Sequence, residues 1–330
     1  MIGLVSYLAF FLTMAGIMAI ITLGLNLQWG YTGLFNGGIV AFFGAGAYGT
    51  MILGSGPEPG QFGGFELPWL VAITGGILFA AALAWVVGIL TLRLKHDYLA
   101  ISTFGVAVAL ESLARNAQWL TGGARGMRGF PRPFEEMVGD TFTYGLVFLA
   151  IVLVVLALVW WGIERLVHSP FGRALRAIRE DETAARALGK NPARLRLWSL
   201  VIGSAIMGAG GGLYVSYTAF ISPQDLLPVL TFQVWAMLIV GGAGNNRGAV
   251  LGAVLIWGVW TLSGFALTRL APDSMQLDAG SIQYILIGTL IVTMLLWRPE
   301  GLLPERISST TPSPNATMTA GKAAPSRKAN

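Results

Sequence analysis

Apolar stretches long enough to cross a lipid bilayer recur along almost the whole chain. A membrane-spanning helix needs roughly 20 predominantly apolar residues. Candidate stretches lie at about 4–27, 34–54, 68–92, 98–117, 142–163, 197–219, 229–244, 248–268 and 281–297. This pattern predicts an all-α, polytopic transmembrane fold in which residues 1–306 form one helical membrane domain.

The low content of charged residues supports the same conclusion. Of the 330 residues, 55% are hydrophobic and only 11% are charged, whereas a soluble domain carries about 25% charged residues. So few charges could not cover the surface of a globule of this size, but lipid could. The net charge of +5 does not indicate nucleic acid as a partner, because the basic residues are dispersed between apolar runs.

Two of the apolar segments differ from ordinary spans. Segment 34–54 is rich in Gly, and segment 229–244 is short and runs into the sequence GGAGNN. Short or Gly-interrupted segments can be broken or re-entrant where the surrounding protein buries them. We therefore expect eight or nine membrane segments, of which these Gly-rich pieces do not form regular spans.

The basic residues are distributed asymmetrically between the loops. Ser169–Trp198 holds seven of the 21 Lys and Arg residues, whereas none precedes Arg93. Because cytoplasmic loops carry an excess of Lys and Arg, this loop should be cytoplasmic. The pattern predicts a multi-pass protein of the inner (plasma) membrane, with a cytoplasmic C-terminus. Nine full spans would leave the N-terminus outside, unless one segment does not cross or a first helix is absent upstream.

The two ends of the chain differ in character. The first residues, MIGLVSYLAF, contain no positive region and no cleavage site of small residues, so we expect a retained span and not a signal peptide. Residues 307–330 are poor in large apolar side chains, and we expect a disordered cytoplasmic tail there.

The charged loop itself has the pattern of a helix. Ser169-Pro170 is a good helix start, and Gly189 with Pro192 is a good helix end. Apolar residues between them recur at helical spacing, which predicts a polar surface helix over 170–188, about 28 Å long. Its other faces carry Arg173, Arg176, Arg179, Glu180, Glu182 and Arg186. Such a helix could lie on anionic lipid, form a solvated connector, or dock a soluble partner through its mixed charges.

Here the sequence resembles a known family. The run ALRAIREDETAARALGKNPARLRLWSLVIGSAIMGAGGGLYV is similar to the cytoplasmic coupling loop of ABC-transporter permeases, most closely the M-type subunits of branched-chain amino acid importers. The broader family has Glu-Ala-Ala, three residues and Gly. Ala184-Ala185 and Gly189 match that pattern, whereas Thr183 stands in place of Glu. Other similar stretches are GLNLQWGYTGLFNGGIVAFFGAGAYG, LKHDYLAISTFGVA with WLTGGARGMRG, LIVGGAGNNRGAVLGAV and WRPEGLL, and together they span nearly all of 20–303.

The resemblance implies a permease subunit of an ABC importer for branched-chain amino acids. It implies that the loop 164–197 couples the chain to ATPase subunits through the 170–188 helix, with the six charged residues above and Gly189 at the contact. It also implies a second, related permease subunit, two ATP-binding cassette subunits and a periplasmic substrate-binding protein, all within membrane lipid. One departure concerns the substrate: the subfamily often has Ser and His where this chain has Phe35-Asn36-Gly37-Gly38. Urea or short amides therefore stay open as substrates.

Several polar residues lie in or near the apolar segments. Asn26, Gln28, Asn36 and Gln233 could line a pathway or simply bond to neighbouring helices. Glu111 is four residues before Arg115, so the two can form an ion pair on one helix. A stand-alone proton-coupled transporter that uses Glu111 as its proton carrier is the alternative from another class.

The sequence gives little support for an enzyme or a cofactor. There is no Cys, and the two His residues, His96 and His168, are far apart, so we expect no metal site. The sequence from Gly44 to Gly49 fits a dinucleotide-binding pattern, but it lies inside an apolar span and predicts close helix packing instead. No complete P-loop is present, so ATP hydrolysis should take place on separate subunits. A membrane-embedded enzyme would need catalytic polar residues that the sequence does not show.

Overall fold

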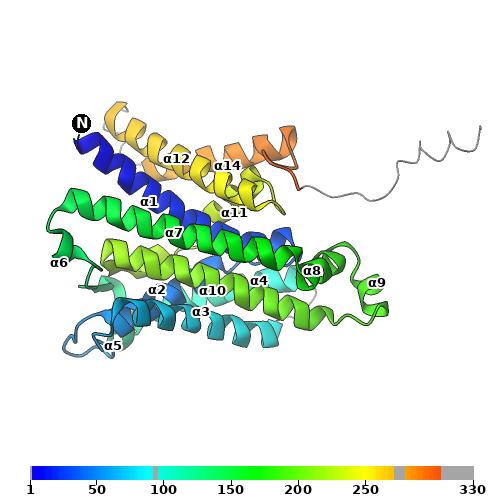
Figure 1. The fold of residues 1–330 in the computed structure, drawn as a ribbon, viewed down its shortest axis with the longest axis horizontal. Coiled ribbons are helices and arrows are strands. Elements are labelled where there is room, and N and C mark those ends of the chain that lie inside the picture. Colours follow the sequence, from blue (N-terminus) through cyan, green and yellow to red (C-terminus); the bar gives the residue numbers. More distant parts are fainter. Residues whose placement is uncertain (1, 92–95, 271–278, 306–330) are drawn as a thin grey trace, which may run out of the picture.

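The computed structural model describes residues 2–91, 96–270 and 279–305. Its helices lie side by side along the long axis of the molecule (Figure 1). Seven of them are long and apolar enough to cross a membrane. These are α1 (Ile2–Leu25), α3 (Trp69–Thr91), α4 (His96–Asn116), α7 (Thr141–His168), α10 (Pro192–Thr218), α12 (Asn246–Leu270) and α14 (Ala279–Trp297).

Two further apolar helices, α2 (Ile39–Gly54) and α11 (Val229–Gly241), are shorter. At 1.5 Å per residue they are about 24 and 20 Å long, which is less than the thickness of the hydrocarbon core. They occupy the two segments whose Gly content or length predicted irregular spans. The all-α polytopic fold is therefore confirmed, with seven candidate spans and two shorter apolar helices in the part of the chain that is described. The predicted tail at 307–330 lies outside the described residues.

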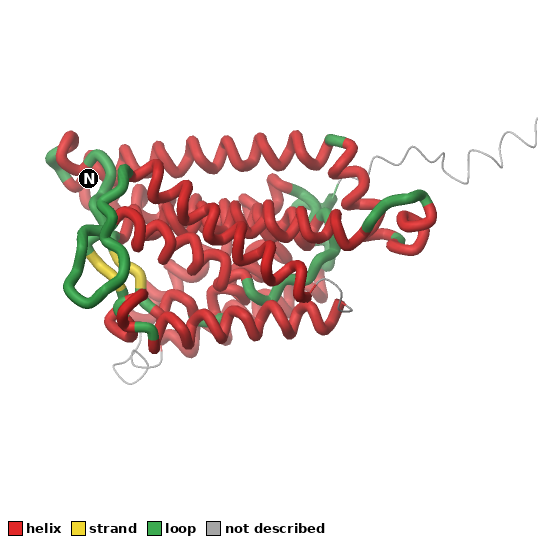
Figure 2. Tube along the Cα trace, turned by 90° about the horizontal axis from the view of Figure 1, so that it is seen from below, coloured by secondary structure: helices red, strands yellow, loops and turns green. Residues whose placement is uncertain are grey.

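The remaining elements lie near the two ends of the bundle. One end, here the α8 end, carries the charged loop with α8 (Pro170–Glu180) and α9 (Glu182–Ala187), together with a π-helical turn, η1 (Asn26–Gly30). The other, here the α5 end, carries the short elements drawn partly as yellow strands in Figure 2. They are α5 (Gln118–Thr121), η2 (Gly123–Arg125), β1 (Met127–Arg128), α6 (Glu135–Val138), β2 (Phe220–Ile221) and η3 (Pro223–Leu226).

The strands pair two loops at the α5 end. β1 and β2 are antiparallel, with Met127 opposite Ile221. Gly126, just before β1, has φ +71°, and a Cβ there would lie 2.2 Å from the Ile221 oxygen, so this close pairing requires Gly. The connection between α4 and α7 is thereby fixed to the connection between α10 and α11.

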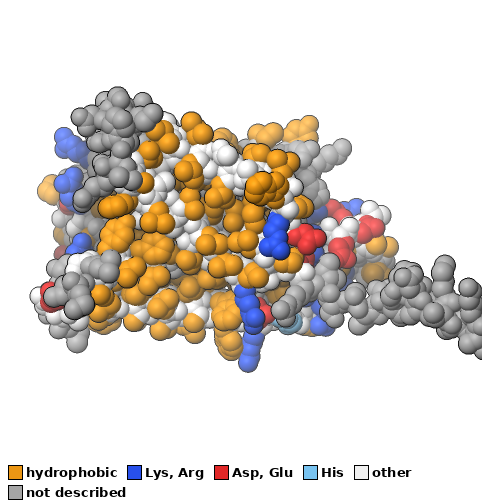
Figure 3. Space-filling view, turned by 90° about the horizontal axis from the view of Figure 1, so that it is seen from above, with side chains coloured by type: hydrophobic (Ala, Val, Ile, Leu, Met, Phe, Trp, Pro, Cys, Tyr) orange, Lys and Arg blue, Asp and Glu red, His pale blue; other side chains and the backbone are white. Residues whose placement is uncertain are grey.

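Two helices form the centre of the bundle. In α1, 78% of the most apolar stretch is buried inside the protein, and in α10 the share is 72%, compared with 17% in α7 and 11% in α14. The outer helices present an apolar surface around the middle of the molecule, and the charges gather toward the ends (Figure 3). This distribution is what a bilayer requires of a protein that it surrounds.

Small residues allow α2, α3 and α10 to pack closely. A Cβ on Gly46 of α2 would lie 2.4 Å from the Cα of Gly208 in α10, and a Cβ on Gly211 would lie 2.1 Å from the Phe43 oxygen. The close packing expected of the Gly44–Gly49 stretch is therefore present. Because lipid is as apolar as the helices, this close backbone contact stabilises their association.

The packing predicts that Gly211→Ala destabilises the bundle. The added methyl group would collide with backbone, which cannot move aside, and such overpacking costs about 1–3 kcal/mol. We expect a lower midpoint when the purified protein is heated in detergent and its folded fraction is followed by size-exclusion chromatography.

Gly162→Ala is the matched control. Gly162 is also helical, but a Cβ there meets no atom within 4 Å, so the midpoint should stay unchanged or rise slightly. Equal midpoints for the two variants would contradict this account of the packing.

Candidate functional site: an apolar groove beside a polar junction

The chain leaves helical geometry between η1 and α2. Residues 31–38 form an irregular segment that begins with the backbone of Gly33 donating to the Trp29 oxygen at 2.9 Å. Gly33 has φ +69°, a conformation that favours Gly. At the end of the segment, the amide of Val40 donates to the Thr231 hydroxyl at 3.2 Å. The starts of the two short helices, α2 and α11, therefore lie together inside the bundle.

Two buried amide side chains hold this segment in place. Asn36 donates to Gln28 Oε1 and accepts from the Gly38 amide, both at 2.8 Å. Gln28 in turn donates to the Leu200 oxygen of α10 at 3.0 Å and to Ser204 at 3.2 Å. Asn36 and Gln28 are fully buried, so in this structure they bond to neighbouring elements and do not line an open pathway.

The other polar residues of the apolar segments have different surroundings. Gln233 in α11 is 7% exposed, and its Nε2 has no hydrogen-bond partner among the described residues. Glu111 forms an ion pair with Arg115 on the same helix, as the four-residue spacing predicted. The Arg115 side chain is 53% exposed and the pair lies toward the α5 end of α4. The structure therefore does not bring Glu111, Gln233 and Asn36 together into one site.

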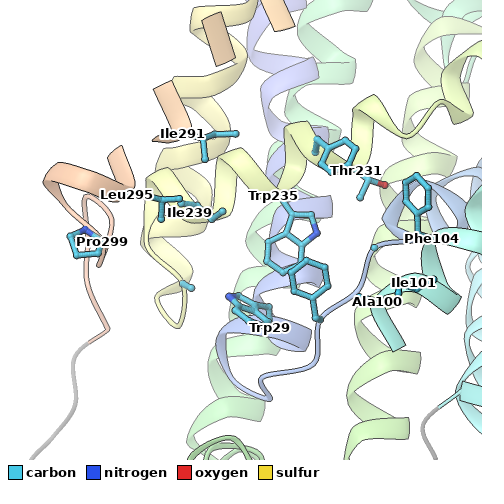
Figure 4. Close-up of a pocket in the computed structure, with 14 residues that line it drawn as sticks. Trp29, Ala100, Ile101, Phe104, Thr231, Trp235, Ile239, Ile291, Leu295 and Pro299 are labelled. Carbon is cyan, nitrogen blue, oxygen red and sulfur yellow. The ribbon is translucent and has the colours of Figure 1, made fainter. Parts of the chain in front are cut away.

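An apolar groove of about 690 Å³ lies between α4 and α14, with α11 and the irregular segment along its base. Figure 4 shows Ile101 and Phe104 on the α4 side, Ile291 and Leu295 on the α14 side, and Trp235 between them. Its walls offer very few polar atoms, and Thr231 is one of its few polar residues. Such a surface suits aliphatic groups better than charged ones.

Three aromatic rings form a cluster at the base of this groove. Phe35 stacks on Trp235 with ring centroids 4.4 Å apart, and Trp29 meets both rings edge-on at 5.5 and 5.3 Å. The Trp235 indole also donates to the Asn36 backbone oxygen at 3.0 Å. The cluster joins η1, the irregular segment and α11, and we refer to these three residues as the aromatic cluster.

The charged loop at the α8 end consists of two helices and not the single rod predicted over 170–188. Ser169 begins α8 as expected, with Pro170 in the first turn. The helix ends at Glu180 because Asp181 is extended, with φ −149° and ψ 104°. Its carboxylate accepts from the amides of Thr183 and Ala184 at 2.8 and 3.0 Å. Asp181 thus starts a new helix, α9, as an N-cap residue.

Three of the predicted contact residues are engaged within the chain. Arg179 donates to the Gly30 oxygen and forms an ion pair with Glu305 at 2.8 Å. Arg176 donates to the Val167 oxygen at 2.9 Å. Glu182 forms ion pairs with Arg186 and Arg196 at 2.7 and 2.8 Å. Arg179 and Arg176 therefore bond within the fold and are less exposed than the sequence predicted, while their contact with an ATPase stays a prediction.

Other residues of the loop face outward. Arg173 is exposed, and the side chains of Glu180 and Arg186 are 69% and 65% exposed. Leu188 is 80% exposed, and Gly189 beside it has φ +76°, with no atom within 4 Å of where a Cβ would lie. The tip of the loop is an exposed apolar side chain surrounded by charges, a combination typical of a contact surface.

A polar junction connects η1 to the turn between α11 and α12. Asn26 at the start of η1 donates to Asn246 at 2.9 Å and accepts from the Gly244 amide at 2.8 Å. Asn246 also donates to Glu164 near the end of α7 at 2.7 Å. Asn26 is therefore fully buried in a structural network, which corresponds to the second of the two roles considered from the sequence, bonding to neighbouring elements.

Residues 298–305 extend this junction and are here called the strap. The amides of Leu302 and Leu303 donate to the oxygens of Val240 and Gly241 at 2.9 and 3.0 Å. The strap thereby satisfies carbonyl groups at the end of α11. Four stretches that carry the family resemblance meet here: η1, the charged loop, the turn after α11 and the strap.

A hollow of about 590 Å³ opens between the strap, α7 and α8, and Tyr31 lies on its wall. Burial raises the pKa of the Tyr31 phenol, and the carboxylates of Glu164 and Glu305 raise it further. The phenol therefore stays protonated at physiological pH and does not serve as an anionic ligand. No cluster of three His, Asp or Glu residues suited to a metal ion occurs in the part of the chain that is described.

The sequence did not identify Trp29 and Trp235 as members of the aromatic cluster. It also did not predict that the Arg179 side chain bonds to Gly30 and Glu305 inside the protein. Both Trp residues occur in apolar stretches where a large aromatic side chain is unremarkable. A partial signal was available for the break at Asp181, because Asp followed by Glu and Thr is a typical helix start.

The sequence matches the family described as "Branched-chain amino acid transport system / permease component" over residues 7–295. It is 33% identical to the high-affinity branched-chain amino acid transport system permease protein LivM of Escherichia coli K12, over 88% of this chain and 69% of the relative. A probable LivM of Methanocaldococcus jannaschii is 30% identical, over 92% of this chain and 95% of the relative. The E. coli LivH permease is 24% identical, over 87% of this chain and 94% of the relative. No solved structure gives a significant match.

The geometry predicts that Asn36→Ala destabilises the irregular segment. The substitution leaves Gln28 Oε1 and the Gly38 amide without partners in a buried place, at a cost of about 1–3 kcal/mol for each group. We expect a clear fall in the thermal midpoint in detergent. Asn116→Ala is the control, since Asn116 is exposed and bonds only to Ser112 of its own helix; a fall of equal size in both variants would refute the prediction.

Proposed function

This chain belongs to the branched-chain amino acid permease family, and from that premise we propose that it works as the LivM-type permease subunit of an ABC importer. It is a multi-pass membrane protein whose helices form part of the translocation pathway. The observation that carries the proposal is the family match over residues 7–295, combined with the charged loop that projects from one end of the bundle (Figure 1).

The substrates that we propose are leucine, isoleucine and valine, which the names of the relatives indicate. The apolar groove supports this choice, because its walls can solvate an aliphatic side chain. Urea or a short amide would find few hydrogen-bond partners there. The groove therefore favours branched-chain amino acids over the small polar solutes that the Phe35-Asn36-Gly37-Gly38 departure left open.

The partners are proposed from the family and from the exposed surfaces. Similarity to relatives named LivM and LivH supports a second, related permease subunit, and the groove between α4 and α14 is the face on which we place it. Two ATP-binding cassette subunits would supply ATP hydrolysis, and a periplasmic protein would deliver the substrate. This subunit itself needs no cofactor in that arrangement.

The α8 end is proposed to face the cytoplasm, where the ATPase subunits bind. The basic residues of the loop favour this orientation. The contact residues that we propose are the outward-facing ones, namely Arg173, Glu180, Arg186 and Gly189, with Leu188 as an added apolar anchor. The C-terminus would then also be cytoplasmic, since the strap lies at this end.

The docking proposal predicts that Leu188→Asp combined with Arg186→Glu weakens ATPase binding. Burying the new carboxylates in an apolar contact is unfavourable, and a loss of about 1.4 kcal/mol already lowers the affinity tenfold. We expect at least a tenfold loss of ATPase in co-purification, with unchanged membrane insertion. Glu58→Lys at the exposed α5 end is the control and should leave the association intact; full retention of ATPase by the double variant would overturn the assignment.

Transport by the complete complex tests the function itself. Vesicles that hold all proposed subunits should accumulate radiolabelled leucine only with ATP and the binding protein present. Glu111→Gln should retain uptake within about twofold, because Glu111 bonds only to Arg115 of its own helix among the described residues and lies in no shared site with the other polar residues. ATP-independent uptake by this chain alone, lost in Glu111→Gln, would instead identify the proton-coupled alternative.

A further inference from the structure

Arg179 points into the bundle, although it belongs to the most polar helix of the protein. Its side chain is 23% exposed, and that of its partner Glu305 is 17% exposed. One guanidinium nitrogen donates to the Gly30 oxygen, and another donates to Glu305 Oε2 at 2.8 Å. Arg179 therefore connects α8 to the end of η1 and to the strap at the same time.

The aliphatic part of Arg179 also packs against the irregular segment. A Cβ on Gly33 would lie 3.0 Å from Arg179 Cγ. The side chain thus contacts the backbone at Gly30 and at Gly33, the two ends of a tight turn. A displacement of α8 would therefore act directly on the backbone of the turn, because the turn has no side chain at either position.

This turn lies between two members of the aromatic cluster. Trp29 precedes Gly30, and Phe35 follows Gly33 by two residues. Both rings contact Trp235 at the base of the groove, and a second hollow of about 730 Å³ is lined by Arg179 together with Trp29 and Phe35. A short, continuous series of contacts therefore runs from α8 through Arg179 to the groove.

We propose that Arg179, held by Glu305, is the positioning residue through which movement of α8 shifts the Trp29–Phe35–Trp235 cluster, and that this cluster gates the groove. This inference rests on the proposed function, since it assumes that an ATPase moves α8. Arginine suits the role because its planar guanidinium can donate in two directions at once, whereas a lysine ammonium is a single point of charge. The partly buried ion pair adds specificity to the contact, because a charge left there without its partner would be unfavourable.

The first test compares leucine transported with ATP hydrolysed in vesicles that hold the complete transporter. Arg179→Ala should assemble and hydrolyse ATP, but its ratio of transport to hydrolysis should fall at least fivefold. Arg194→Ala is the control, because Arg194 is exposed at the same end and its side chain has no polar partner among the described residues. An unchanged ratio in Arg179→Ala would overturn the proposal.

The second test asks whether Arg179 acts through the aromatic cluster. Phe35→Ala should also lower the ratio at least fivefold, and the double variant Arg179→Ala with Phe35→Ala should be no worse than the poorer single variant. Residues that act independently would instead give the product of the two defects. If the defect of the double variant equals the product of the two single defects, the gating role is overturned. Two substitutions that merely weaken the structure independently would also give that product, so they would not produce the expected non-additive result.

Glu305→Gln replaces Arg179→Ala in both tests if the latter does not assemble. It retains the shape of the side chain and removes only the ion pair, so a smaller fall in the ratio, at least twofold, is expected; a normal ratio would overturn the proposal. Failure of the proposed function has a different outcome, since the wild-type complex would then show no ATP-dependent leucine uptake at all.

Discussion

The structure depends on one constraint of the bilayer: backbone groups that leave helical geometry must find their hydrogen bonds inside the protein. Residues 31–38 meet it with buried partners, chiefly Asn36, Gln28 and the hydroxyl of Thr103, which accepts from the Gly37 amide at 2.9 Å. Because these partners come from η1 and α4, the irregular segment can exist only when those elements are in place. Two short helices, the groove and the aromatic cluster all follow from this arrangement.

The runs of apolar residues were sufficient to predict the fold class and the location of the long helices, because lipid imposes length and composition directly on each helix. They also marked the segments of α2 and α11 as different from ordinary spans, and in the structure both helices are short. The Glu111–Arg115 pair was predictable for the same reason, as both residues belong to one helical turn. Residue spacing along the sequence thus predicts contacts within a single helix, but not contacts between elements that are far apart in the chain.

The site was less predictable because its contacts join distant parts of the chain. Arg179 lies in a charged, polar stretch of sequence, which predicted an exposed side chain. Its partners Gly30 and Glu305, however, are 149 and 126 residues away in the sequence. For Asn26 and Asn36 the sequence left open whether they line a pathway or bond to neighbouring helices, because only the folded bundle brings their backbone partners near. Gly37 in the irregular segment likewise approaches a distant element, since an added Cβ there would lie 2.9 Å from the Ala100 oxygen of α4.

The central position of α1 has a consequence for how the protein is made. This helix leaves the ribosome before the neighbours that enclose it in the finished bundle, α7, α10 and α12, which occupy residues 141 to 270. Until those residues are synthesised, α1 must rest in lipid without its final contacts, which its apolar sequence permits. Biogenesis therefore has a long interval in which the future core is exposed to the bilayer, and assembly finishes only when the last third of the chain has been inserted.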